Sequence, residues 1–301
     1  DQPLRVLDLN GKINFSAWGA ETLTPVVLDG EIESSVDLAD EFTRAIKRAM
    51  KTGAELVLPP GIFRITRPGT FLSKDFLGRH DGLVITGSGR ESTIVLYDPP
   101  DEEPLIWNNN SVIGIRLSRM TFHTNSPGAT FARMFGNGVS QDHHFCDITW
   151  RGSWATGVEL VPNPDSGNEG NNNSEFVFDR VFTAVYSNRF VLLSGLASDQ
   201  NLNFWFTNCK LWGWITIAHL EKGGHVHVLN CDVSGYSPRD RNYLFHLMGK
   251  SHAQGVCSFS VRGLRVELKN NNALVLQSEW TSGNIEIAGL DLSSQTYRVK
   301  S

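Results

Sequence analysis

Cysteine is scarce in this sequence, and its spacing argues against the common metal and redox sites. The 301-residue chain has four cysteines: Cys146, Cys209, Cys231 and Cys257. No two of them form a CxxC pair, which argues against a zinc ribbon or a thioredoxin-type centre. The hydrophobic pattern places Cys209 and Cys231 inside the protein, where a free cysteine packs as a small apolar residue. We therefore favour buried thiols over a disulfide.

Long apolar runs and clusters of basic residues are also missing. No apolar run approaches the roughly 18 residues of a membrane-spanning helix, so membrane insertion is not expected. The net charge is -5 and no segment is rich in lysine and arginine, which disfavours a nucleic-acid partner. The hydrophobic content of 40% and the charged content of 20% suit a folded protein rather than a disordered one.

Standard catalytic signatures are absent as well. The sequence has no HExxH, no GxSxG and no Walker-type loop, and Gly87-Ser-Gly89 lacks the third glycine of a dinucleotide motif. His143 with His144, and His225 with His227, have no third ligand at a suitable spacing, so we interpret them as ordinary surface histidines. No metal and no cofactor is therefore expected, and an active site would be assembled from residues far apart in the sequence.

What the chain does contain is a short pattern written twice. Residues 204–213 read FWFTNCKLWG and residues 226–235 read VHVLNCDVSG, 22 residues later. Each copy has two alternating apolar residues, an asparagine, a small buried residue, an exposed residue and another apolar residue. A motif that recurs at a small period is the signature of a solenoid.

The same pattern extends along most of the chain. The second inward residue of each copy is Leu58, Ile85, Leu117, Phe145, Phe178, Phe206, Val228, Val261 and Ile287. Two residues later comes a corner position, occupied by Arg119, Asp147, Arg180, Asn208, Asn230, Gly263 and Gly289. Asn, Asp and Gly tolerate the left-handed conformation of a sharp corner. An antiparallel sandwich would not keep this motif in phase, so we expect about nine parallel coils, ~4.8 Å apart and about 40 Å long in total.

The N-terminal part differs from the repeats. Residues 1–35 are interpreted as a linker or cap, and residues 36–301 as the solenoid domain. A helix is predicted over about 37–52, with Asp37 as its N-cap and Phe42, Ala45, Ile46 and Ala49 on its apolar stripe. ELVLPPGIFRIT at 55–66 then reads as a strand, a turn and a second strand.

This helix, ELVLPPGIFRIT and LVITGSGRESTIVLYD at 83–98 together resemble the opening segment of the pectate-lyase-like right-handed parallel β-helix superfamily, found in many bacteriophage tailspikes and polysaccharide depolymerases. The resemblance implies an all-β, right-handed, single-stranded parallel β-helix with an N-terminal capping α-helix. It also implies a homotrimer in a virion tail or outside the cell, with a bacterial surface polysaccharide as its substrate.

Stacked coils supply a rule for finding catalytic carboxylates. Residues in one column are ~4.8 Å apart on adjacent coils and ~9.6 Å apart on alternate coils, whereas carboxylates about 5 Å apart suit a retaining glycosidase and about 6.5–9.5 Å an inverting one. The third strand of a coil and the loops after it carry our candidates, Glu159, Asp199, Glu221 and Asp240. An outward column with Lys210, Asp232 and Arg265 is interpreted instead as a surface ion ladder.

Aromatic residues gather at the corner that leads into the third strand. They are Trp154, Tyr186, Trp212, Trp214 and Tyr236. Such rings either stack on sugars or plug the corner or contact a neighbouring subunit, and the sequence leaves this choice open. Asp240, flanked by Arg239 and Arg241, borders this ladder, as do Glu159 and the outward His246. The two arginines would hold the carboxylate of an acidic sugar.

Three functions fit this pattern. The favoured one is a polysaccharide-degrading enzyme that hydrolyses the glycan with one carboxyl group as acid and another as base or nucleophile. A lyase would instead use a base such as His246 to remove a proton beside a uronate carboxylate, with Arg239 and Arg241 neutralising that carboxylate. A non-catalytic tail adhesin would hold the glycan on the aromatic ladder without cutting it.

Overall fold

The computed structural model describes most of the chain. The described residues are 12–14, 26–28, 31–33, 36–74, 76, 80–109, 112–136, 140–162, 173–193, 203–221, 224–235, 242–247, 257–268, 273–278 and 283–292. Within them lies one α-helix, α1 (Ala39–Thr52), and no described helix is long and apolar enough to cross a membrane.

Strands make up almost all the remaining regular structure. They are β1 (Lys12–Asn14), β2 (Val26–Leu28), β3 (Glu31–Glu33), β4 (Glu55–Leu58), β5 (Gly61–Ile65), β6 (His80–Gly87), β7 (Thr93–Tyr97), β8 (Pro104–Asn109), β9 (Val112–Thr124), β10 (Thr130–Gly136), β11 (Ser140–Gly152), β12 (Thr156–Pro162), β13 (Asn173–Asp179), β14 (Phe182–Leu193), β15 (Phe204–Thr207), β16 (Lys210–Leu220), β17 (His225–Gly235), β18 (Asn242–Leu247), β19 (Cys257–Leu268), β20 (Ala273–Ser278) and β21 (Gly283–Asp291). All but β2 and β3, which pair antiparallel, belong to one 19-stranded sheet.

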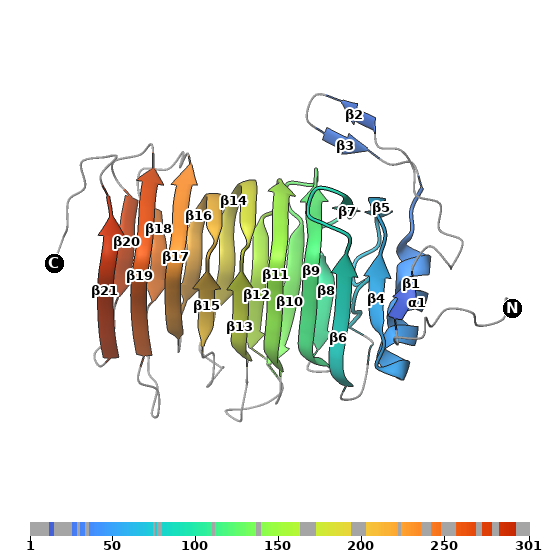
Figure 1. Ribbon diagram of the computed structural model, residues 1–301, viewed down its shortest axis with the longest axis horizontal. Helices are drawn as coiled ribbons and strands as arrows, with labels where there is room; N and C mark the ends of the chain where they lie inside the picture. The colour runs from blue at the N-terminus through green and yellow to red at the C-terminus, as the bar shows by residue number, and fades with distance from the viewer. Residues whose placement is uncertain are drawn as a thin grey trace, which may run out of the picture.

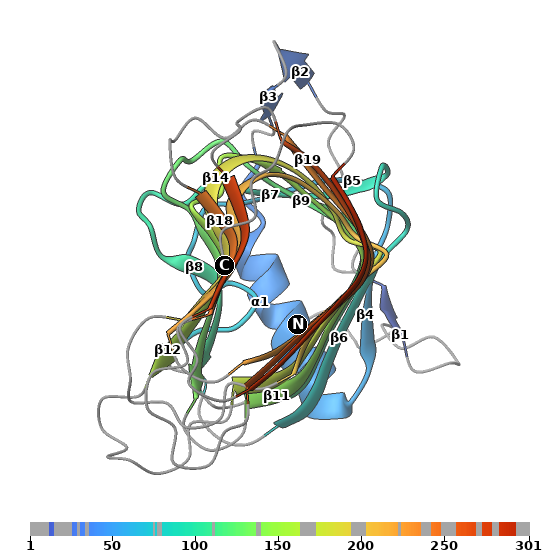
Figure 2. The ribbon, with the colours of Figure 1, turned by 90° about the vertical axis from the view of Figure 1, so that its left-hand side faces the viewer.

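Parallel pairing joins the strands of this sheet into ladders, and long strands belong to two ladders because they bend at a corner. The first ladder runs β4–β6–β9–β11–β13–β15–β17–β19–β21. The second runs β5–β7–β9–β11–β14–β16–β17–β19–β21. The third runs β8–β10–β12–β14–β16–β18–β20. Figure 1 shows these strands side by side along the molecule, and Figure 2 shows them superposed around a common axis. The predicted all-β parallel β-helix is therefore confirmed.

The register of the first ladder agrees with the predicted repeat. Phe145 pairs with Leu117, Phe178 and Phe206 continue the column, and Val228, Val261 and Ile287 complete it. The prediction for the first position was wrong: Ile85 pairs with Leu56, and Leu58 pairs with Gly87. Leu56 and Leu58 are both fully buried, and a strand's period of two residues cannot distinguish two inward leucines two positions apart.

The predicted corners adopt the predicted backbone. Every corner residue has a left-handed φ, from 50° at Arg180 to 71° at Gly263, and the complete column is Arg119, Asp147, Arg180, Asn208, Asn230, Gly263 and Gly289. As far as Val261, the side chains two residues before the corners pack inward. Among them, the ring of Phe178 stacks on the rings of Phe145 and Phe206, with centroid distances of 5.3 and 5.0 Å respectively. Cys209 and Cys231 are buried free thiols, as predicted.

Helix α1 lies at the N-terminal end of the stack (Figure 1). Phe42 is fully buried and stacks on Phe71 at 5.3 Å, so the apolar stripe of the helix joins the common core. The helix is followed by Gly53, which has a left-handed φ of 68°, the usual conformation just after the last residue of a helix. Asp37 is not the N-cap: that position is Leu38, and the Asp37 carboxylate accepts the N–H of Ala39 and the N–H and hydroxyl of Thr66.

Candidate functional site

One register column of the third ladder consists mostly of polar and aromatic residues. Their register order is Trp107, Arg133, Glu159, Leu192, His219, His246 and Gln277. The neighbours of these positions on the strands, such as Val158, Leu160, Phe245 and Leu247, are buried. Because side chains alternate along a strand, the described side chains of this column, those of Trp107, Arg133, Glu159, His219 and His246, face outward. We call it the outer column.

At the end nearer the N-terminus, an arginine holds a carboxylate in the outer column. The Nε of Arg133 donates to the Oε2 of Glu159 at 2.7 Å, and the side chains of both residues are 22% exposed. The Arg133 guanidinium also lies 5.1 Å from the ring centre of Trp107 and 3.7 Å from a carboxylate oxygen of Glu103. These contacts orient Glu159 along the face and confirm the predicted outward position of this residue.

Farther along the stack, two imidazoles and a carboxylate form a connected group. The Nδ1 atoms of His219 and His246 lie 3.0 Å apart, so the N–H of one ring donates a hydrogen bond to the nitrogen of the other. The Nε2 of His219 lies 3.7 Å from Oε1 of Glu221, and the side chains of His219 and Glu221 are 15% and 28% exposed. A carboxylate that orients one imidazole, which in turn contacts a second, is an arrangement suited to moving a proton.

The two groups share one face at a defined spacing. Glu159 and His219 are separated by one register position, Leu192, which corresponds to ~9.6 Å along the stack. The structure thus brings together three predicted residues, Glu159, Glu221 and His246. Sequence reasoning missed Arg133 and His219. A signal for His219 is present, because Ala218-His219-Leu220 and Phe245-His246-Leu247 repeat one apolar–His–Leu pattern on adjacent strands.

Several predicted site residues cannot be placed on this face. Asp199, Tyr236, Arg239, Asp240 and Arg241 lie outside the described residues. The backbones of Tyr186 and Trp214 belong to β14 and β16, but their side chains are outside the described part of the structure. These residues stay predictions.

The predicted aromatic ladder changes where the structure describes it. Trp154 is fully buried, with its ring 6.0 Å from Tyr97 and 5.8 Å from Phe131, so it packs in the core and its prediction as a sugar-binding surface was wrong. An aromatic residue at a corner has no strand alternation to fix its direction, and here the indole packs inward among other rings. Trp212 is half-buried on the second ladder, and its carbonyl accepts the hydroxyl of Thr183.

Three further histidines, His143, His225 and His227, contact residues of neighbouring strands. His143 is fully buried, contrary to its interpretation as a surface residue, and its Nδ1 accepts the N–H of Ile115 at 3.3 Å. That burial lowers the pKa of His143 to about 3. His225 and His227 contact the hydroxyls of Ser258 and Ser260 at 2.6 and 2.8 Å, and burial lowers the pKa of each imidazole. In the described ranges no three His, Cys, Asp or Glu side chains gather as metal ligands.

Solved structures of phage proteins and of a polysaccharide-modifying enzyme are similar to this chain. The pre-mature gene product 12 of bacteriophage phi29 matches 92% of this chain with a TM-score of 0.55 at 13% identity. ORF18 of Geobacillus virus E2 matches 93% of this chain and 62% of its own length (TM-score 0.48, 10% identity). The A-module of mannuronan C-5 epimerase AlgE4 from Azotobacter vinelandii matches 96% of this chain and its whole length (TM-score 0.34, 13% identity).

The match to gene product 12 shows a shared parallel β-helix fold, as the sequence resemblance predicted. This chain spans 45% of the length of that phage protein. No protein-family model matches the sequence, and no curated protein sequence does.

Proposed function

We propose that this protein binds a bacterial surface polysaccharide along the outer column and cleaves it there. The observation that carries the proposal is the column itself, which places Arg133, Glu159, His219 and His246 in register on one face with Glu221 beside them. The fold does not need these polar groups on the outside of a ladder. A row of acids and bases at regular spacing matches a polymer substrate, which presents repeating units.

Hydrolysis is the reaction that we favour. Glu159 lies two register steps, ~9.6 Å, from His219, and His219 contacts Glu221. This step is just above the roughly 6.5–9.5 Å between the carboxyl groups of an inverting pair, a spacing that leaves room for a water molecule. Glu159, oriented by Arg133, would activate that water. Glu221 would protonate the leaving oxygen, and His219 and His246 would position this carboxyl group and return its proton.

The close contact of the two histidines favours a second candidate, β-elimination on a uronate-containing glycan. His246 would accept the proton next to the uronate carboxylate, and His219 would share the charge. The freed electron pair would form the carbon–carbon double bond as the bond to the glycosidic oxygen breaks, and this leaving oxygen would take a proton from water. In this reaction Glu221 is a positioning residue. The products would be unsaturated sugars, which absorb ultraviolet light, whereas hydrolysis gives saturated products.

The surrounding architecture belongs to the same proposal. We take the protein to be a tailspike-like component of a phage particle, outside the cell and assembled as a homotrimer. Its solenoid would have about nine coils over residues 36–301, and α1 would cap the N-terminal end of the first coil. The division into a linker or cap over residues 1–35 and a solenoid domain over residues 36–301 is part of this proposal. So are the sugar-stacking roles of Trp212, Trp214, Tyr186 and Tyr236.

The test is incubation with a panel of purified capsules and O-antigens, followed by sizing of the glycan and an ultraviolet spectrum of the products. Shortened, saturated chains support hydrolysis, and shortened, absorbing chains support elimination. If a glycan binds but is never shortened, the protein acts as an adhesin, and the proposed cleavage is contradicted. Loss of shortening in Glu159→Gln, with activity retained in Glu286→Gln, would locate the reaction. Glu286 is a matched control because it also pairs with an arginine, Arg262, at 2.8 Å on another face.

A further inference from the structure

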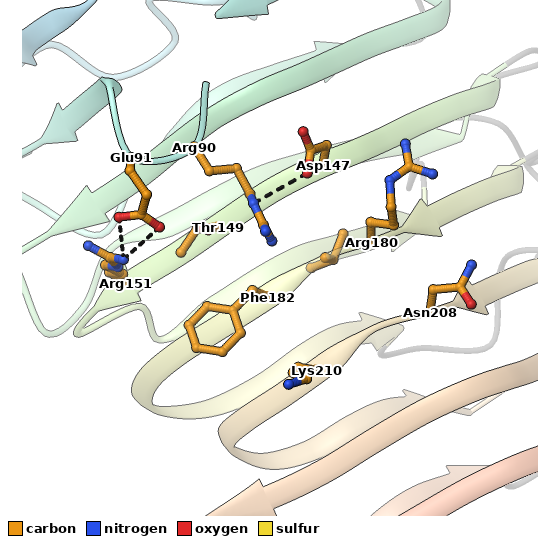
Figure 3. Close-up of a pocket in the computed structure, with 10 residues that line it drawn as sticks. Arg90, Glu91, Asp147, Thr149, Arg151, Arg180, Phe182, Asn208 and Lys210 are labelled. Atoms are coloured by element: carbon orange, nitrogen blue, oxygen red, sulfur yellow. Dashed lines mark hydrogen bonds and ion pairs between the residues drawn. The ribbon is translucent and has the colours of Figure 1, made fainter. Parts of the chain in front are cut away.

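A hollow of 490 Å³ lies on the second ladder, away from the outer column. Its floor is the outward register column Thr149, Phe182 and Lys210, on consecutive strands β11, β14 and β16. The loop that carries Arg90 and Glu91 forms one side, and the corner residues Asp147, Arg180 and Asn208 form another (Figure 3). We call this feature the corner hollow.

Positive charge predominates in the corner hollow. Four cations line it, Arg90, Arg151, Arg180 and Lys210, against two carboxylates. Glu91 pairs with Arg151 at 3.0 Å, and Asp147 pairs with Arg90 at 3.3 Å. Arg180 pairs with Asp179, which does not line the hollow. Lys210 is exposed and has no ion pair within the described part of the chain, so it is available to an anionic ligand.

The arginine in this wall is not explained by the backbone. Arg180 has a φ of 50° at a corner where the next two strands carry Asn208 and Asn230. The left-handed conformation favours asparagine and glycine and costs other residues about 1–2 kcal/mol. The Arg180 side chain offsets part of this cost through its ion pair with Asp179, and its guanidinium group also lines the hollow. The other arginine of the corner column, Arg119, donates to the carbonyl of Ser88 instead.

A buried hydroxyl on the floor of the hollow lacks a hydrogen bond. Thr149 is 1% exposed, and its Oγ1 has no partner among the described residues. The hydroxyl at the equivalent position of the preceding strand is satisfied, since Thr121 donates to the carbonyl of Arg90, and the neighbouring buried Thr183 donates to the carbonyl of Trp212. An unpaired buried polar atom is costly, and a ligand oxygen in the hollow would supply the missing partner.

The ring of Phe182 lies between the threonine and the lysine in the register. It is half-buried and is drawn beside Thr149 and Lys210 in Figure 3. An aromatic ring next to cations matches a ligand that has both an apolar face and a negative charge. A pyranose ring with a carboxylate group has both.

We infer that the corner hollow is a second glycan-binding site, separate from the outer column, that recognises a sugar bearing a carboxylate. The carboxylate lies near Lys210, the sugar face lies on Phe182, and a sugar oxygen pairs with Thr149. The inference rests on the proposed function only in taking a glycan as the ligand. It adds that this glycan is acidic and is held at a place where no cutting occurs.

The test is calorimetric titration of the intact protein with a galacturonate trisaccharide at low salt. Its neutral methyl ester is expected to bind about tenfold more weakly, because the charge-assisted contacts are lost. Lys210→Gln is expected to weaken binding of the acid about three- to fivefold. The matched control is Lys47→Gln, which removes an exposed lysine of α1 and should leave binding unchanged.

Thr149→Val separates recognition from folding. Valine has the same shape and no unpaired hydroxyl, so the melting temperature should hold or rise while affinity falls about two- to tenfold. Thr183→Val is the contrast, because it breaks an existing hydrogen bond and should lower the melting temperature.

Three results would overturn the inference. They are absence of trisaccharide binding, equal binding by Lys210→Gln, and equal binding of inorganic sulfate, which would make the hollow a general anion site. These outcomes are distinct from failure of the proposed function. Acid-specific binding with no cleavage of any glycan supports the hollow alone, and cleavage with no effect of Lys210→Gln supports the outer column alone.

Discussion

Two columns of the same solenoid contrast in what determines their residues. At the corner between the first and second ladders every residue has a left-handed backbone, and most of the residues there are Asn, Asp or Gly. In the outer column of the third ladder the backbone is ordinary strand, and the residues are Trp107, Arg133, Glu159, Leu192, His219, His246 and Gln277.

The difference shows where function can be sought in a stack of coils. A corner residue is selected mainly by the backbone conformation that it must adopt. An outward strand position accepts almost any side chain, so a connected group of two histidines and a glutamate there needs another reason. Changes in the corner column should therefore alter stability, whereas changes in the outer column should alter activity.

The largest expected effect is on cleavage by His219→Gln. His219 contacts the acid Glu221 of the hydrolysis scheme and the base His246 of the elimination scheme. Removing its imidazole disturbs the acid or the base in either reaction, so the cleavage rate should fall by about 10²- to 10⁴-fold. The melting temperature should fall only slightly, because the imidazole lies on the outer side of the ladder and not in the core. His225→Gln, on the first ladder, is the matched control and should cleave normally. A fully active His219→Gln would remove the outer column from the mechanism.

A smaller loss, about a hundredfold, is expected for Glu159→Gln. Glutamine keeps the shape and can still contact Arg133 but cannot accept a proton. The rate should be measured by the appearance of new glycan ends across pH, because loss of one limb of the pH profile identifies a proton-transfer role. An unchanged profile with a higher KM would assign Glu159 to binding only.

A third prediction concerns His143 in the core and the dependence of the unfolding free energy on pH. Its pKa is about 3 in the folded protein against 6.5 when exposed. Between these values the unfolded chain binds a proton that the folded protein does not, so stability falls as pH falls, by about 1.4 kcal/mol per pH unit. Denaturant unfolding of wild type and His143→Gln should show that the variant loses this part of the slope. Equal slopes would contradict the neutral buried imidazole.

The smallest effect is expected at the corner. Asn230→Ala should cost about 1 kcal/mol of unfolding free energy because alanine disfavours the φ of 51°. Asn230→Gly should be nearly neutral, and both variants should cleave the glycan at the wild-type rate. If Asn230→Ala abolished cleavage without unfolding, the separation between the two columns would fail.

Most of the fold was predictable from the sequence because each strand repeats one local rule. The inward residues Leu117 to Ile287 and the corners Arg119 to Gly289 all occupy their predicted places. The direction of Trp154 was not predictable, since a corner aromatic has no periodicity to orient it. The partnership of His219 with His246 and the hollow around Thr149 were missed because both depend on contacts between strands rather than on spacing within one strand.

The register of the first ladder has a consequence for how this molecule can change. Phe206 and Val228 are 22 residues apart and Phe145 and Phe178 are 33 apart, yet each pair is directly opposite across adjacent strands. The length of chain between two rungs is therefore uncoupled from their alignment. A connecting loop can be lengthened, shortened or replaced by one from another protein, and the ladders on both sides of it keep their geometry. Loop exchange is thus a practical way to alter the surface of this molecule on an unchanged scaffold.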